Sequence, residues 1–334
     1  MSGYFKTHIL QNHLVIALML VLLAYITHEL KGVLVSLFVA YILMAAFSPF
    51  VDFLLRKGIR RGLSVVLVYF LFLVTLILII LPLVPFVVTQ FESLAVNFPD
   101  YLNRIGAMLG IPTGNFDLAG LVRSETDALT RNAFVVTSKV FGGLFSFLTT
   151  IVVSVYLLIE KNKFRQGFVS LFPSNNHHMV EQTLNNIDNL LGAWVRGQIT
   201  LSFSIGLATW LGLTILRVPF ALPLAVIAGF LEAVPMIGPI ISAVPAVVVA
   251  LTVSPALSLA VVGLYIVVQQ TENHLLVPKV MQKALGLSPV IVILGIAAGG
   301  QLLGIIGAII AIPVILVVTT IVRGIKDAAK NSSS

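Results

Sequence analysis

Residues Val65–Ile80 read VVLVYFLFLVTLILII, an apolar run interrupted only by Thr75 and the hydroxyl group of Tyr69. A helix needs about 20 mainly apolar residues to cross a hydrocarbon layer of roughly 30 Å. A strand of a transmembrane barrel would instead alternate polar and apolar residues over about ten positions. Because lipid offers no hydrogen-bond partner to an open strand edge, this run predicts a membrane helix.

The composition extends this prediction to the whole chain. Of the 334 residues, 58% are hydrophobic and 10% are charged, whereas about a quarter are charged in ordinary soluble domains. We therefore predict an all-α integral membrane protein with about six full spans and two segments broken by proline and glycine. The expected spans are 14–27, 33–53, 63–88, 141–159, 198–216 and 255–271, the last within a broken region, 219–322.

Five regions follow from the apolar pattern. About three membrane helices (1–88) precede an extracytoplasmic amphipathic segment (89–140), which is either an interfacial helix pair or an oligomerisation or lid element. A membrane helix and a cytoplasmic amphipathic helix come next (141–197), before a transport core with broken helices (198–322) and a cytoplasmic tail (323–334).

Charge predicts the orientation. The net charge of +7 is not arranged as a basic stripe interleaved with aromatic residues, so nucleic acid is not an expected partner. The densest short basic cluster is Arg56, Lys57, Arg60 and Arg61, which the positive-inside rule places in the cytoplasm. Threading the chain from there puts both termini in the cytoplasm.

Metal and cofactor chemistry have little support. The chain has no cysteine, which excludes disulfides and thiolate metal sites. His177 and His178 lack partners at metal-ligand spacing, so we expect solvent-facing side chains there. We predict neither a metal nor a cofactor.

The broken region suggests two inverted hairpins. Nine of the 15 prolines fall between 219 and 313, and lipid tolerates such breaks only where protein or a cavity satisfies the freed backbone groups. Two segments resemble each other, one from Pro223 to Pro245 and one from Pro289 to Pro313. Their leading arms, 220–234 and 287–299, form roughly 20 Å of helix, which favours re-entrant hairpins over complete spans.

Glu232 is the first candidate site residue, because it lies in an apolar run without a neighbouring charge. A buried acid in a membrane costs several kcal/mol unless it is protonated, paired or facing water. It either binds a coupling ion or caps the following helix. Gln269, Glu272 and Asn273 close the 255–271 span, as a second site or as a solvated helix end.

Other polar and small residues complete the candidate set. Arg196 and Gln198 enter the 198–216 span, where Arg196 is either an anchor or an ion-pair partner of Glu232 or Glu272. Small-residue spacing indicates either close helix packing or a moving hairpin tip. The expected hairpin residues are Pro235, Gly238, Pro239, Pro278, Gly299, Gly300, Gly304 and Gly307.

Several motifs in order resemble the autoinducer-2 exporter family, also called PerM-like permeases. They are Arg196-Gly-Gln198, EAVPMIGPII from Glu232, ENHLLVPK from Glu272, and LGLSP from Leu285 followed by the glycines and Pro313. The resemblance implies a bacterial inner-membrane homo-oligomer that exports autoinducer-2 or exchanges sodium or lithium for protons. His274 stands where the family pattern suggests a small polar residue.

Function classes can be compared on the same residues. The sequence contains no HExxH metal pair and no GxSxG nucleophile elbow, so an enzyme is not expected. A passive channel or scaffold would need neither buried acids nor inverted hairpins. We therefore predict a transporter of a small solute, with a proton or sodium gradient as the candidate driving force.

Overall fold

The computed structural model describes residues 13–78, 81, 133–235, 237–277 and 288–331. Within these ranges all regular structure is helical and no strand occurs. Five helices are long and apolar enough to cross a membrane, and shorter apolar helices accompany them. The predicted all-α membrane fold is therefore confirmed.

The N-terminal helices overlap the expected spans, of which 63–88 is described only in part. They are α2 (His13–Glu29), α3 (Lys31–Arg56), the helix over Arg61–Leu78 and α6 (Ala133–Ile159). Most of the predicted segment 89–140 lies outside the described residues. A shared core joins α3, Arg61–Leu78, α6 and α8 through Met44, Val65, Leu158 and Leu191.

Helix α8 (His177–Ile215) connects the two halves of the molecule. It follows the short amphipathic helix α7 (Lys161–Val169) and the 3-10 turn Ser174–Asn176. Its 39 residues span about 58 Å, well beyond the hydrocarbon thickness. The predicted amphipathic helix and the span from 198 are therefore one continuous element.

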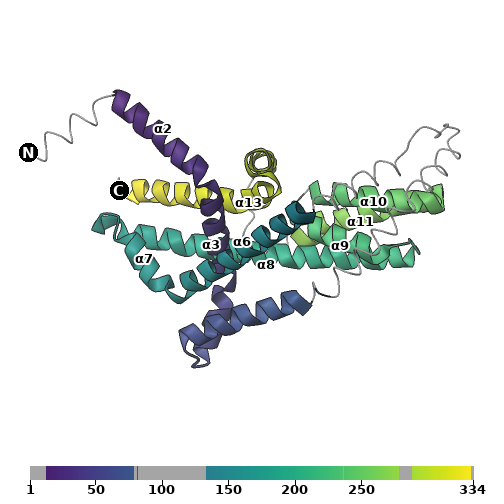
Figure 1. Cartoon of the computed structure of the whole chain (residues 1–334), viewed down its shortest axis with the longest axis horizontal. Helices are drawn as coiled ribbons and strands as arrows, with labels where there is room; N and C mark the ends of the chain where they lie inside the picture. Colours follow the sequence, from purple (N-terminus) through teal and green to yellow (C-terminus); the bar gives the residue numbers. More distant parts are fainter. Residues whose placement is uncertain (1–12, 79–80, 82–132, 236, 278–287, 332–334) are drawn as a thin grey trace, which may run out of the picture.

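Three further helices form a bundle with the second half of α8, in which α9 and α11 contact α8 and α10 packs on both of them (Figure 1). They are α9 (Ala221–Leu231), α10 (Ile237–Val253) and α11 (Pro255–Thr271). Leu213, Leu224, Val249 and Val261 form their common core. With 11 residues, α9 rises only about 17 Å. The α9–α10 turn consequently lies part-way along α8, beside Gln198.

Helix α13 (Pro289–Asn331) folds back on itself at Gly304, where φ is 65° and ψ is −147°. A Cβ atom at Gly307 would lie 2.0 Å from the carbonyl oxygen of Gly299, so the two arms touch through their backbones. Gly299 and Gly307 thus allow close packing of the two arms. The depth of both hairpins in a bilayer stays a prediction.

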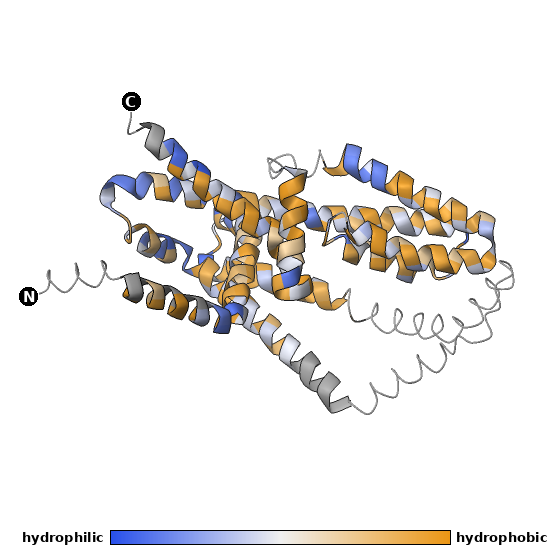
Figure 2. Cartoon of the chain, turned by 90° about the horizontal axis from the view of Figure 1, so that it is seen from above, coloured by the Kyte–Doolittle hydropathy of each residue, from blue (hydrophilic) through white to orange (hydrophobic). Residues whose placement is uncertain are grey.

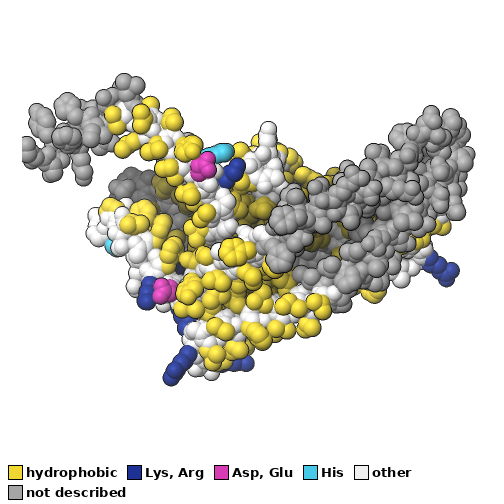
Figure 3. All heavy atoms as spheres, viewed as in Figure 1, with side chains coloured by type: hydrophobic (Ala, Val, Ile, Leu, Met, Phe, Trp, Pro, Cys, Tyr) yellow, Lys and Arg dark blue, Asp and Glu magenta, His cyan; other side chains and the backbone are white. Residues whose placement is uncertain are grey.

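The outer surfaces suit a membrane. Figure 3 shows hydrophobic side chains over much of the described surface, with Lys, Arg, Asp and Glu at scattered points. Figure 2 shows hydrophilic residues gathering toward the end of the molecule that carries the C-terminus. The two views separate an apolar helical bundle from a more polar end.

Candidate functional site

Glu232 lies in the turn that follows α9, and its side chain is 1% exposed. The side-chain amide of Gln198 donates to its backbone carbonyl at 2.6 Å, which fixes the turn against α8. Neither carboxyl oxygen of Glu232 receives a hydrogen bond from a described residue. A buried polar group without a partner is costly, so the charged form of this acid is unfavourable unless a proton or a cation neutralises it.

Glu272 meets Glu232 in space although 40 positions separate the two in sequence. It opens the π-helix η2 (Glu272–Leu276) after α11, and it is 4% exposed. The two carboxyl groups lie close enough to interact electrostatically. Gln269 Nε2 also donates to Glu272 Oε2 at 3.0 Å, which orients that carboxyl group.

The carboxyl pair holds two acids without a basic partner among the described residues. Two adjacent buried negative charges repel strongly, so the arrangement is stabilised by a proton shared between the groups or by a bound cation. Gln198 Oε1 is likewise buried without a donor. The site therefore presents acceptor oxygens of the kind that hard cations prefer.

Of the two alternatives for Arg196, the structure shows an anchor and, among the residues it describes, no ion pair with Glu232 or Glu272. Its guanidinium group donates to the carbonyl oxygen of Ala46 at 3.2 Å, which ties α8 to α3 instead. Asn273 is exposed, and its Oδ1 lies 3.5 Å from Gln269 Nε2, at the edge of the pair. The sequence thus identified both acids and the two glutamines that contact them.

Glycine and proline residues shape the turn between α9 and α10, where Glu232 lies. A Cβ atom at Gly238 would lie 2.0 Å from the carbonyl oxygen of Leu231, so only glycine lets α10 begin so close to the end of α9. Pro235 and Pro239 flank this approach. Gly299, Gly300, Gly304 and Gly307 belong to the α13 hairpin, and Pro278 lies outside the described residues.

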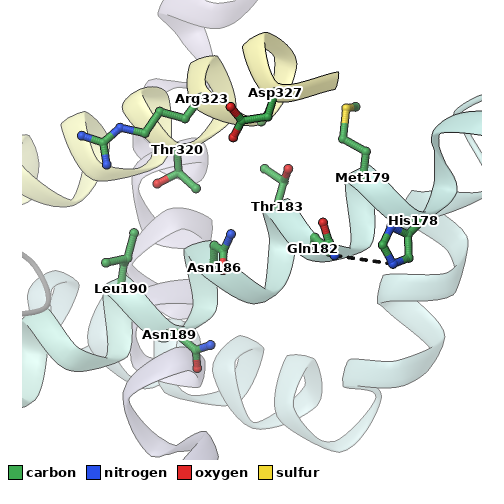
Figure 4. Close-up of a pocket in the computed structure, with 11 residues that line it drawn as sticks. His178, Met179, Gln182, Thr183, Asn186, Asn189, Leu190, Thr320, Arg323 and Asp327 are labelled. Atoms are coloured by element: carbon green, nitrogen blue, oxygen red, sulfur yellow. Dashed lines mark hydrogen bonds between the residues drawn. The ribbon is translucent and has the colours of Figure 1, made fainter. Parts of the chain in front are cut away.

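A polar groove of about 490 Å³ separates the first half of α8 from the C-terminal arm of α13. Figure 4 shows Gln182 and Asn186 on α8 below Arg323 and Asp327 on α13, with the Arg323 guanidinium directed away from Asp327. Thr183, Asn189 and Thr320 also line the groove. The sequence interpretation did not predict this groove, because the apolar periodicity of α8 predicts only the face that packs against the protein.

Asp188 forms a second buried acidic site, also missed from the sequence. It is 8% exposed. Its Oδ1 accepts a hydrogen bond from the Tyr41 hydroxyl group, and its Oδ2 lies 3.0 Å from Lys161 Nζ and 3.2 Å from an Arg165 nitrogen. This Asp188 cluster joins α3, α7 and α8.

Comparison with known proteins places these sites in a family. Residues 14–327 match the model of the AI-2E family transporter. The chain belongs to the AI-2E transporter family. YueF of Bacillus subtilis is 30% identical over 299 residues, which cover 84% of this chain and 80% of that protein. The AI-2 transport protein TqsA of Escherichia coli K12 is 24% identical, covering 85% and 83% of the two chains.

Two of the motifs that resemble the AI-2E family come together in the carboxyl pair. Glu232 begins EAVPMIGPII, Glu272 begins ENHLLVPK, and Gln198 from a third motif holds the turn between α9 and α10. Membership in the family establishes a membrane transporter of several helices. The buried pair is the strongest candidate for its functional site.

Proposed function

We propose that this AI-2E family transporter exports a small polar solute across the bacterial inner membrane, using a proton or sodium gradient. The observation that carries the proposal is the buried Glu232–Glu272 pair, which lacks a cationic partner among the described residues. Transport is the property shared with the family, and one relative is named for AI-2 transport. The solute is therefore expected to be AI-2 or a related small molecule.

Coupling follows from the chemistry of the pair. A carboxyl pair in an apolar site binds either a proton or a metal cation, because both neutralise the same negative charge. Gln269 and Gln198 hold the two acids at fixed positions on α11 and α9. Alternating occupancy of one site by proton and cation is the minimum chemistry of a coupled carrier.

The polar groove between α8 and α13 provides a place for the solute. Its amides, hydroxyl groups and opposite charges offer donors and acceptors to a polar molecule. The positive-inside rule favours cytoplasmic termini. Because the C-terminal arm of α13 lines this groove, we expect the groove to face the cytoplasm, from which an exporter takes up its solute. In a homo-oligomer, which the resemblance implies, part of each bundle would face lipid and part would face neighbouring copies.

Two alternatives remain within the same architecture. A sodium or lithium/proton antiporter would use the carboxyl pair alone, with no solute in the groove. A passive oligomeric channel would need no buried acid at all. The unpartnered oxygens of Glu232 favour a coupled carrier over a channel.

Flux in proteoliposomes with an imposed proton or sodium gradient tests the proposal, with AI-2 included in a panel of small solutes. Glu232→Gln should lower the gradient-driven flux at least tenfold, to about the flux without a gradient, because the amide cannot bind and release a proton. The protein should stay folded. Glu232→Asp should retain part of the activity. The matched control is Glu181→Gln, an exposed acid on α8.

The outcomes separate the candidate functions. Gradient-driven solute flux in the wild-type protein supports the exporter, and ion exchange without solute flux supports the antiporter. Wild-type coupling in Glu232→Gln would show that this acid is structural.

A further inference from the structure

The Asp188 cluster carries more positive than negative charge. Lys161 and Arg165 both contact Asp188 Oδ2, and each side chain is only 19% exposed. The tyrosine of the cluster is a neutral hydrogen-bond donor. Lys161 also donates to Ser48 and Arg165 to Asn185, so among the described residues the cluster has neutral partners but one positive charge in excess.

An apolar hollow of about 460 Å³ lies directly beside this cluster. Helices α3, α7, α8 and α13 form its walls, and its lining is hydrophobic except for Tyr41 and Thr183. Tyr41, Phe164, Phe168 and Leu184 line both the hollow and the small space around Asp188. An apolar chamber thus ends at a site with excess positive charge.

Helix α7 has the composition of an interfacial helix. Phe164 and Phe168 turn toward the hollow, whereas Lys163 on another face is 80% exposed and pairs with Glu160. Aromatic residues on one face and cations on another are typical of helices at the boundary between headgroups and acyl chains. Basic pockets between membrane helices bind anionic lipid headgroups.

We infer that the hollow beside the Asp188 cluster binds one anionic phospholipid, with an acyl chain in the hollow and its phosphate against Lys161 and Arg165. The single negative charge of a phosphodiester balances the excess cation of the cluster. A small polar solute would leave the hydrophobic walls uncovered, and a neutral lipid would leave the excess charge unpaired. The inference is independent of what the transporter carries.

Lipid binding by the full-length protein tests the charge requirement. Native mass spectrometry in detergent would compare phosphatidylglycerol with phosphatidylcholine of the same acyl chains. We expect a preference of about fivefold for phosphatidylglycerol, the order contributed by one cation near an anionic lipid. Lys161→Gln should remove this preference, and Lys163→Gln, two residues along the same helix, should keep it.

Filling the hollow tests the second half of the inference. Leu37→Trp, from a residue that lines the hollow, should lower phosphatidylglycerol retention several-fold, because the larger side chain takes the space of the acyl chain. Leu18→Trp on α2 is the control, because Leu18 is 71% exposed and does not line the hollow. Circular dichroism and size-exclusion chromatography confirm that each variant is folded.

Three results would overturn the inference. The wild-type protein would show no preference for phosphatidylglycerol, the two lysine variants would lose it equally, or Leu37→Trp would retain as much lipid as Leu18→Trp. The first would leave the cluster a purely structural contact. The second would indicate general surface attraction, and the third would place the lipid elsewhere.

Discussion

Two buried acids in this transporter have opposite surroundings. Asp188 accepts a hydrogen bond from a tyrosine hydroxyl group and forms ion pairs with two cations. The Glu232 carboxyl group accepts no hydrogen bond from a basic or amide donor among the described residues. Both are nearly inaccessible, at 8% and 1% exposure. Burial alone therefore does not identify a functional acid, and the supply of partners separates the two.

The difference has an energetic meaning. A buried carboxylate with several donors is fixed, and removing it leaves its partners uncompensated. A buried carboxylate without donors lowers stability until a proton or cation arrives. The Asp188 cluster is thus expected to hold α3, α7 and α8 together, and the Glu232–Glu272 pair to bind and release an ion.

The largest expected effect is on Asp188. Asp188→Asn should lower the free energy of unfolding by about 3 kcal/mol, because two partly buried cations then lose their counter-ion. Thermal unfolding in detergent measures the loss. Glu160→Gln, which breaks the exposed pair with Lys163, should cost no more than about 0.5 kcal/mol. Equal effects of the two substitutions would remove the distinction between the buried and the exposed acid.

The carboxyl pair should respond in the opposite direction. Glu272→Gln keeps the shape of the side chain and removes one of two adjacent acids, so unfolding should become harder by about 1 to 2 kcal/mol. The same unfolding measurement, at neutral pH and without sodium, checks this gain. A loss as large as that of Asp188→Asn would mean that Glu272 is also a structural acid.

The smallest expected effect on stability comes from the tyrosine of the Asp188 cluster. Tyr41→Phe removes one hydrogen bond to Asp188 and leaves both cations in place. The expected loss is about 1 kcal/mol, near the usual contribution of one hydrogen bond. Val65→Ala in the same core is a control for lost packing without lost polarity. A Tyr41→Phe loss larger than that of Asp188→Asn would contradict the dominance of charge in the cluster.

The two candidate acids could be singled out from the sequence because each interrupts an apolar run. Glu232 lies between apolar neighbours, and Glu272 ends an apolar helix. Their meeting could not be predicted, because it depends on the short length of α9 and on the return of α11 to the same level. The glycines of the α13 hairpin were recognisable by spacing, which reports close packing directly.

Asp188 could not be singled out from the sequence, because it does not interrupt an apolar run. It lies among asparagines on an amphipathic stretch, where an acid usually faces water. Its partners come from α3 and α7, at sequence distances of 147 and 23 residues for Tyr41 and Arg165. The choice between the two alternatives for Arg196 could not be made either, since its carbonyl partner at Ala46 leaves no mark in the sequence.

The π-helical turn at Glu272–Leu276 begins at the carboxyl pair. A π-turn accommodates one residue more than the regular helix around it, and such turns occur often at functional sites. Relaxing it into α-helix would shift the register by one residue, a screw rotation of about 100° about the helix axis. With α11 in place, that rotation would turn the chain that follows the π-turn, from Val277 onward, and would leave Glu272 with α11. The π-turn thus sets the direction in which the chain leaves the carboxyl pair.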